Sequence, residues 1–130
     1  MNDNVANYSK GARGERELLA ILHENKYAVM RSAGSGINSI SPDLIAIKEG
    51  KGLAFECKAW DSTSISIPHE KYESLLEWER NTFMPMLIGW RMNAKGWYFI
   101  KLSELTKTEK SYTVTMKNAM AINRRIEAII

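Results

Sequence analysis

The order of apolar segments along this chain predicts an α/β fold, in which helices flank a mixed β-sheet. Apolar residues recur at helical spacing near the start, and short apolar runs separated by turn residues fill the middle. Helical spacing returns in one central stretch and again at the end. The 130 residues are 45% apolar, which is sufficient for a core. We therefore expect a single domain over 1–130, with residues 1–9 flexible.

The first helix is expected over 11–25, where Leu18 and Leu22 lie on one stripe. Glu15 stands three and seven residues before these leucines, so it extends the same stripe, whereas Glu17 falls on the far side of the helix. A carboxylate on a stripe that faces the core is costly unless it is paired or binds a cation. Glu15 is therefore a candidate functional residue.

The remaining elements follow from turn residues and spacing. Strands are expected over 27–31, 43–47, 53–59, 86–90 and 97–100, with 113–115 as an additional edge strand. The turn over 48–52 makes a hairpin of the second and third strands, and the apolar run over 86–90 suits a buried central strand. Residues 34–41 and 61–66 are expected as loops. A second helix is expected over 68–81, and Thr115 is expected to cap a last helix with one apolar face formed by Ala119, Ile122, Ile126 and Ile129.

Composition excludes several classes of protein. No run of about 18 apolar residues is present, so no membrane span is expected. The single cysteine excludes a disulfide framework and a thiolate zinc site, and it favours a reducing cytoplasm. The net charge is +3, with basic residues gathered in the first half. This charge suits a polyanionic partner, although a solvated surface of mixed charge explains it equally well.

Two acids and a lysine come together in the predicted hairpin. Asp43 follows Pro42 at the head of one strand, and Glu56-Cys57-Lys58 lies in the next. Residues i and i+2 of a strand share a face, so Glu56 and Lys58 project together while Cys57 points the other way. Converging carboxylates and an amine suit a divalent metal ion and an attacking water.

Simpler interpretations of the same residues remain open. Glu15 suits a helix N-terminal acid, Asp43 suits a turn, and Glu56 with Lys58 suits an ion pair on an edge strand. We expect Cys57 to be a small buried residue rather than a nucleophile. We expect the indoles of Trp90 and Trp97 to lie in the core or an interface rather than to stack on bases.

Pro42-Asp43 followed by Glu56-Cys57-Lys58 resembles the catalytic motif of the PD-(D/E)xK nuclease superfamily. Two further segments, KGARGEREL from Lys10 and YAVMRSAGSG from Tyr27, look like those of the archaeal Holliday junction resolvases. The resemblance implies a restriction-endonuclease-like α/β fold. It also implies a structure-selective, metal-dependent endodeoxyribonuclease, which resolves four-way (Holliday) DNA junctions by paired symmetric phosphodiester hydrolysis.

The resemblance implies a catalytic role for four residues. Asp43 and Glu56 would be the main metal carboxylates, with the carbonyl of Cys57 as a further ligand. Glu15 would complete the acidic cluster, directly or through water. Lys58 would orient the attacking water or help to deprotonate it. The ion would be Mg²⁺, for which Mn²⁺ can substitute.

The resemblance also implies the partners. Arg31 would grip phosphate oxygens of the junction, and Lys10, Arg16 and Ser35 would make lesser contacts to the DNA backbone. A junction requires two opposed nicks, and a two-fold homodimer offers two equivalent sites.

Three other interpretations are retained. The first is a related nuclease that acts on flaps, mismatches or a specific duplex site. The second is a DNA-binding protein on the same scaffold without activity. The third is an acidic cluster with a purely structural role.

Overall fold

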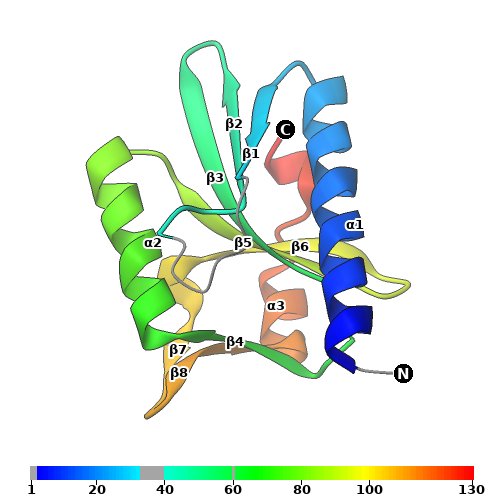
Figure 1. Ribbon diagram of the computed structural model, residues 1–130, viewed down its shortest axis with the longest axis vertical. Coiled ribbons are helices and arrows are strands. Elements are labelled where there is room, and N and C mark those ends of the chain that lie inside the picture. Colours follow the sequence, from blue (N-terminus) through cyan, green and yellow to red (C-terminus); the bar gives the residue numbers. More distant parts are fainter. Residues whose placement is uncertain (1–2, 33–39, 60) are drawn as a thin grey trace.

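A five-stranded mixed sheet forms the centre of the computed structural model, which describes residues 3–32, 40–59 and 61–130 (Figure 1). Its strands follow the spatial order β1-β2-β3-β5-β6. They are β1 (Ala28–Arg31), β2 (Leu44–Lys48), β3 (Lys51–Lys58), β5 (Met86–Met92) and β6 (Gly96–Lys101). Strands β3 and β5 pair in parallel, and the other neighbours are antiparallel. This mixed sheet with flanking helices confirms the expected fold class.

Helix α1 (Asp3–Glu24) covers one face of this sheet (Figure 1). Its leucines Leu18 and Leu22 are fully buried. We call the cluster around them the α1-side core, which also contains Leu44, Ala46, Phe55, Leu87, Trp97 and Phe99. The expected helix start at Gly11 is wrong, because the helix begins at Asp3. No proline precedes Gly11, and a glycine inside a helix costs only about 1 kcal/mol relative to alanine.

The opposite face is covered by α2 (His69–Thr82), by α3 (Met116–Ile122) and by a small antiparallel sheet. This sheet has the order β4-β8-β7, with β4 (Ser64–Pro68), β8 (Ser111–Thr115) and β7 (Thr106–Lys107). Two expectations are corrected here. The polar connection expected over 61–66 contains most of β4, because Ile65 and Ile67 alternate with exposed residues and enter the core. The expected edge strand β8 lies in the middle of its sheet, between β4 and β7.

The C-terminal segment starts as predicted and then departs from the prediction. The side chain of Thr115 caps α3 by accepting a 3.1 Å hydrogen bond from the N–H of Asn118. The helix ends at Ile122, because the next residue, Asn123, has a left-handed φ of 52°, so the expected single face up to Ile129 is wrong. Ile126, in the short helix η2 (Ile126–Ala128), packs against the α1-side core instead of the core around α2. A further short helix, η1 (Leu102–Glu104), follows β6.

The turn between β2 and β3 is tighter than the expected 48–52. Lys48 pairs with Lys51, which leaves only Glu49 and Gly50 in the loop. Their φ values of 53° and 79° are both positive, as the favoured two-residue hairpin turns of type I′ require. This turn fixes the register of the hairpin, and that register decides which side chains meet at its other end.

In the part of the chain that the structure describes, every helix is either too short or too polar to span a membrane.

Replacing Leu22 by alanine is expected to lower the free energy of unfolding by about 2 to 5 kcal/mol, because it leaves a cavity beneath α1. The neighbouring exposed residue supplies a control, since His23→Ala should change stability by no more than about 0.5 kcal/mol. Urea unfolding of both variants measures the difference. Equal stability of the two would contradict the burial of Leu22 under the helix.

Candidate active site

The candidate site lies where β2 begins and β3 ends. Leu44 pairs with Phe55 in antiparallel register. Asp43, which precedes Leu44, therefore lies beside Glu56, which follows Phe55. The N–H of Asp43 donates to the carbonyl of Phe55 at 2.9 Å, and the N–H of Cys57 donates to Asp43 Oδ2 at 2.8 Å. These two bonds hold the Asp43 carboxylate against the end of β3, next to Glu56.

Glu56 is the sole buried charged residue in the described part of the chain, with 6% of its surface exposed. Its Oε1 atom has no hydrogen-bond partner there. Burial and the neighbouring Asp43 raise the pKa of Glu56 to about 7, while Lys71 and Lys58 act to lower it. A carboxylate in this position is therefore stabilised by added positive charge.

Strand periodicity separates the neighbours of Glu56 as the sequence predicts. Cys57 packs against the α1-side core, and burial raises the pKa of its thiol well above the usual value. A thiol with a raised pKa is a poor nucleophile, which agrees with the expected role of Cys57 as a small buried residue. Lys58 acts on Glu56 from the same strand, two residues on.

Glu15 approaches the same carboxylates from α1. Arg31 of β1 donates from Nε to Glu15 Oε2 at 2.8 Å. Burial and Asp43 raise the pKa of Glu15, while Arg31 and Arg16 lower it. The two N-terminal segments that carry the family resemblance are thus joined by an ion pair at the edge of the acidic site.

The remaining sequence-predicted residues are placed less fully. Lys10 lies within α1, and its side chain is outside the description, as is the whole of Ser35. Among the residues that are described, no three acidic, histidine or cysteine side chains gather closely enough to form a metal cluster by themselves. The ligand set of Glu15, Asp43, Glu56 and Cys57 therefore stays a prediction.

Lys71, in the first part of α2, belongs to this site and escaped the sequence analysis. Its Nζ donates to the carbonyl of Ser41 at 3.0 Å and lies 3.8 Å from Glu56 Oε1. The lysine thus connects the segment that leads into β2 with the buried carboxylate. No local pattern marks Lys71, since its contacts are made by folding α2 against the sheet.

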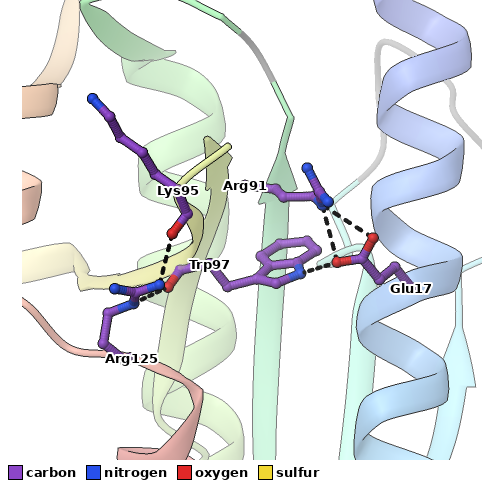
Figure 2. Close-up of polar contacts among 5 residues, drawn as sticks. All are labelled: Glu17, Arg91, Lys95, Trp97 and Arg125. Carbon is purple, nitrogen blue, oxygen red and sulfur yellow. Dashed lines mark hydrogen bonds and ion pairs between the residues drawn. The ribbon is translucent and has the colours of Figure 1, made fainter. Parts of the chain in front are cut away.

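Glu17 is exposed on the far side of α1, as its spacing from the leucines predicts, with 42% of its side chain accessible. Its carboxylate also accepts hydrogen bonds from Trp97 and Arg91, which the sequence did not predict (Figure 2). The indole of Trp97 is 5% exposed and Trp90 is fully buried, which confirms the expectation that both belong to the core.

The mixed sheet, with Asp43 at the head of one strand and Glu56-x-Lys58 at the end of the next, is that of the restriction-endonuclease-like fold. The particular family follows from comparison with known proteins. The family described as archaeal Holliday junction resolvase (hjc) matches residues 6–130, and the chain belongs to this family.

Individual relatives agree with this assignment. The crossover junction endodeoxyribonuclease Hjc of Archaeoglobus fulgidus is 30% identical over 107 residues, which span 82% of this chain and 79% of that protein. The enzyme of the same name from Sulfolobus acidocaldarius is 29% identical over 132 residues, spanning 96% of this chain and 92% of that protein.

Solved structures give the same picture. The structure of Archaeoglobus fulgidus Hjc, described as a Holliday junction resolvase, matches with a TM-score of 0.78 and 25% identity over 85% of this chain and 93% of that chain. A bacterial homing endonuclease shares the fold alone, with a TM-score of 0.51 and 13% identity over 82% of this chain and 72% of that chain. Nucleases of this fold generally use divalent metal ions.

The raised pKa of Glu56 makes the metal-free protein less stable as the pH rises. Between the ordinary value of 4.5 and about 7, the folded state keeps a proton that the unfolded state releases. The free energy of unfolding should therefore fall by about 3 kcal/mol across this interval. Urea unfolding at several pH values in a chelator measures the change. Glu56→Gln should lack this pH-dependent loss of stability. Parallel pH profiles for the wild type and Glu56→Gln would show that the raised pKa of Glu56 does not cause it.

Asp43→Asn is expected to leave the melting temperature of the metal-free protein unchanged or to raise it. The charge of Asp43 raises the pKa of both Glu56 and Glu15, so its removal relieves repulsion among the acids. An amide oxygen can still accept the hydrogen bond from Cys57. Thermal melts beside the exposed control Glu77→Gln test this. A clear loss of melting temperature in Asp43→Asn alone would show that the acidic cluster is structural.

Proposed function

We propose that this chain is a structure-selective endodeoxyribonuclease that resolves four-way (Holliday) DNA junctions by paired symmetric phosphodiester hydrolysis. The proposal draws on membership of the archaeal Holliday junction resolvase family. The observation that carries it is the buried Glu56 carboxylate beside Asp43, with an oxygen that has no hydrogen-bond partner among the described residues. In this proposal the protein acts on cellular DNA in the cytoplasm.

The residues at the site fit Mg²⁺, with Mn²⁺ as a substitute. Mg²⁺ is usually held by one or two carboxylates and keeps several waters, so Asp43 and Glu56 with the carbonyl of Cys57 would hold it. Glu15 would take part directly or through water. When bound, the ion would polarise the scissile phosphodiester and lower the pKa of a water molecule.

The basic side chains of the site have separate tasks in this proposal. Lys58 orients the attacking water or helps to deprotonate it, and its charge offsets that of the phosphate. Lys71 partly balances the charge of Glu56 and holds the carbonyl of Ser41, which steadies the approach to Asp43.

DNA contacts in this proposal centre on Arg31. Its side chain is 42% exposed while its Nε holds Glu15, so the guanidinium can meet a phosphate oxygen at the edge of the site. Lys10, Arg16 and Ser35 contribute lesser contacts to the DNA backbone. Because such contacts are to phosphates, junction binding should weaken steeply with salt and depend little on sequence.

A homodimer is part of the same proposal. The described part of one chain carries one such acidic site, and resolution of a junction requires two opposed nicks. A two-fold dimer presents two equivalent sites to a substrate of matching symmetry.

Cleavage of a labelled immobile four-way junction, beside a linear duplex of the same sequence, tests the proposal. Wild type with Mg²⁺ should make paired symmetric nicks in the junction alone, and a chelator should abolish them. Glu56→Ala should lower the cleavage rate by at least about 100-fold, because it removes one of the two carboxylates, Asp43 and Glu56, that would hold the metal. Glu77→Gln, which removes an exposed acid from α2, should cut as the wild type does.

Two outcomes would change the proposed function. Equal cutting of junction and duplex would keep the nuclease chemistry and discard selectivity for the junction. Junction binding without cutting by the wild type would favour a DNA-binding protein on a nuclease scaffold.

A further inference from the structure

Glu17 joins α1 to two strands of the central sheet. Its Oε1 accepts a 2.8 Å hydrogen bond from the indole Nε1 of Trp97, at the start of β6 (Figure 2). The Nε of Arg91, near the end of β5, lies 2.9 Å and 3.0 Å from the two carboxylate oxygens. Both carboxylate oxygens of Glu17 are therefore engaged by donors from the sheet.

The donor Trp97 is itself held firmly. Its ring is stacked on Phe99 with 6.0 Å between centroids, and only 5% of the residue is exposed. Its carbonyl accepts a 2.8 Å hydrogen bond from Nε of Arg125, whose Nη2 donates to the carbonyl of Lys95 at 2.7 Å (Figure 2). The indole thus offers Glu17 a fixed donor rather than a mobile surface group.

The same turn of α1 also packs closely on the sheet through Gly14. A β-carbon at this position would lie 3.2 Å from Cβ of Ala59 and 3.7 Å from the ring of Trp97. Ala59 directly follows Lys58 of the candidate site. Close packing at Gly14 sets the distance between α1 and the sheet. The hydrogen bonds of Glu17 set the position of α1 along its axis and its rotation about that axis.

Glu15 and Glu17 lie on opposite flanks of this turn. Two residues along an α-helix correspond to a rotation of about 200°. Glu17 reaches β5 and β6 on one flank, while Glu15 reaches Arg31 of β1 and acts on Asp43 from the other. Because the backbone between them is a single rigid turn, a shift of the helix at Glu17 moves the carboxylate of Glu15 relative to Asp43 and Glu56.

We propose that Glu17 is a positioning residue, whose hydrogen bonds with Trp97 and Arg91 hold the α1 turn that places Glu15 at the acidic site. The inference rests on the function proposed for that site. Glu17 acts through Glu15 and has no direct part in hydrolysis. The interaction is specific to an acid that accepts from both donors, so a merely bulky side chain at 17 does not replace it.

The test compares Glu17→Ala and Glu17→Gln with Glu24→Ala, which removes an exposed acid from the same helix. Single-turnover cleavage is measured at saturating protein and at a temperature where every variant is folded, and junction Kd is measured in a chelator. Glu17→Ala should cut about 10- to 100-fold more slowly than wild type with its Kd unchanged. Glu17→Gln keeps an acceptor for the indole and should lose less, while Glu24→Ala should match the wild type.

A double-mutant cycle separates positioning from a general loss of stability. If Glu17 acts through Glu15, then Glu17→Ala should cause little further loss in a Glu15→Gln background. The same fold loss in both backgrounds would overturn the proposal, as would a wild-type rate for Glu17→Ala.

Crystal structures of Glu17→Ala and Glu24→Ala supply a measurement that does not depend on activity. The Glu15 carboxylate should move by about 1 Å in the first variant and stay in place in the second. An undisplaced Glu15 would overturn the positioning role even if the rate fell. If the wild type cut no junction, the proposed function would fail, and these structures would still decide whether Glu17 positions Glu15.

Discussion

The buried carboxyl group of Glu56 is the constraint on which the rest of the site depends. It sits at the end of β3 with 6% exposure and a second acid beside it, and its Oε1 atom has no hydrogen-bond partner among the described residues. Such a group is unfavourable in its charged form unless positive charge is close by. The protein supplies Lys58 and Lys71, whose charges lower the pKa of Glu56, but burial and Asp43 outweigh them and raise it to about 7. A fold that kept this acid for stability alone would do better with an apolar residue, since a buried charge rarely improves stability.

The elements around Glu56 explain how the fold keeps the site in place. The tight β2–β3 turn sets the register that puts Asp43 beside it. The two faces of the sheet then contribute differently, because α1 brings Glu15 from one side and α2 brings Lys71 from the other (Figure 1). Each helix packs against its own hydrophobic core. This packing brings charged groups from distant parts of the chain together.

Local periodicity explains which parts of this arrangement could be predicted from the sequence. The alternation of a strand predicts that Glu56 and Lys58 share a face, and helical spacing predicts that Glu15 faces inward. The predicted helix cap at Thr115 is confirmed for the same reason, since a cap involves residues three apart. The short strand β4 was missed because it carries only Ile65 and Ile67 as inward residues, and the end of α3 was missed because Asn123 stops a helix whose apolar spacing continues.

Long-range contacts explain the features of the site that the sequence did not predict. Glu17 and Trp97 are 80 residues apart, and Lys71 is 30 residues from Ser41. Neither pair falls within the short stretch of sequence over which helical or strand periodicity can be recognised. The spacing of Glu17 relative to the leucines predicts its exposed position, but it does not predict the guanidinium and indole donors that β5 and β6 offer to its carboxylate. Sequence patterns report which face of an element is apolar, whereas partners for polar groups are decided by how elements pack.

We propose that the carboxylates of Asp43 and Glu56, at the end of the hairpin, form a divalent-metal site. Crystals of the wild-type protein soaked in Mn²⁺, with data collected at the manganese edge, test it most directly. We expect an anomalous peak in contact with the carboxylates of Asp43 and Glu56, which should disappear in Glu56→Gln. A peak elsewhere on the molecule, or none at millimolar Mn²⁺ in a site accessible to solvent, would contradict it.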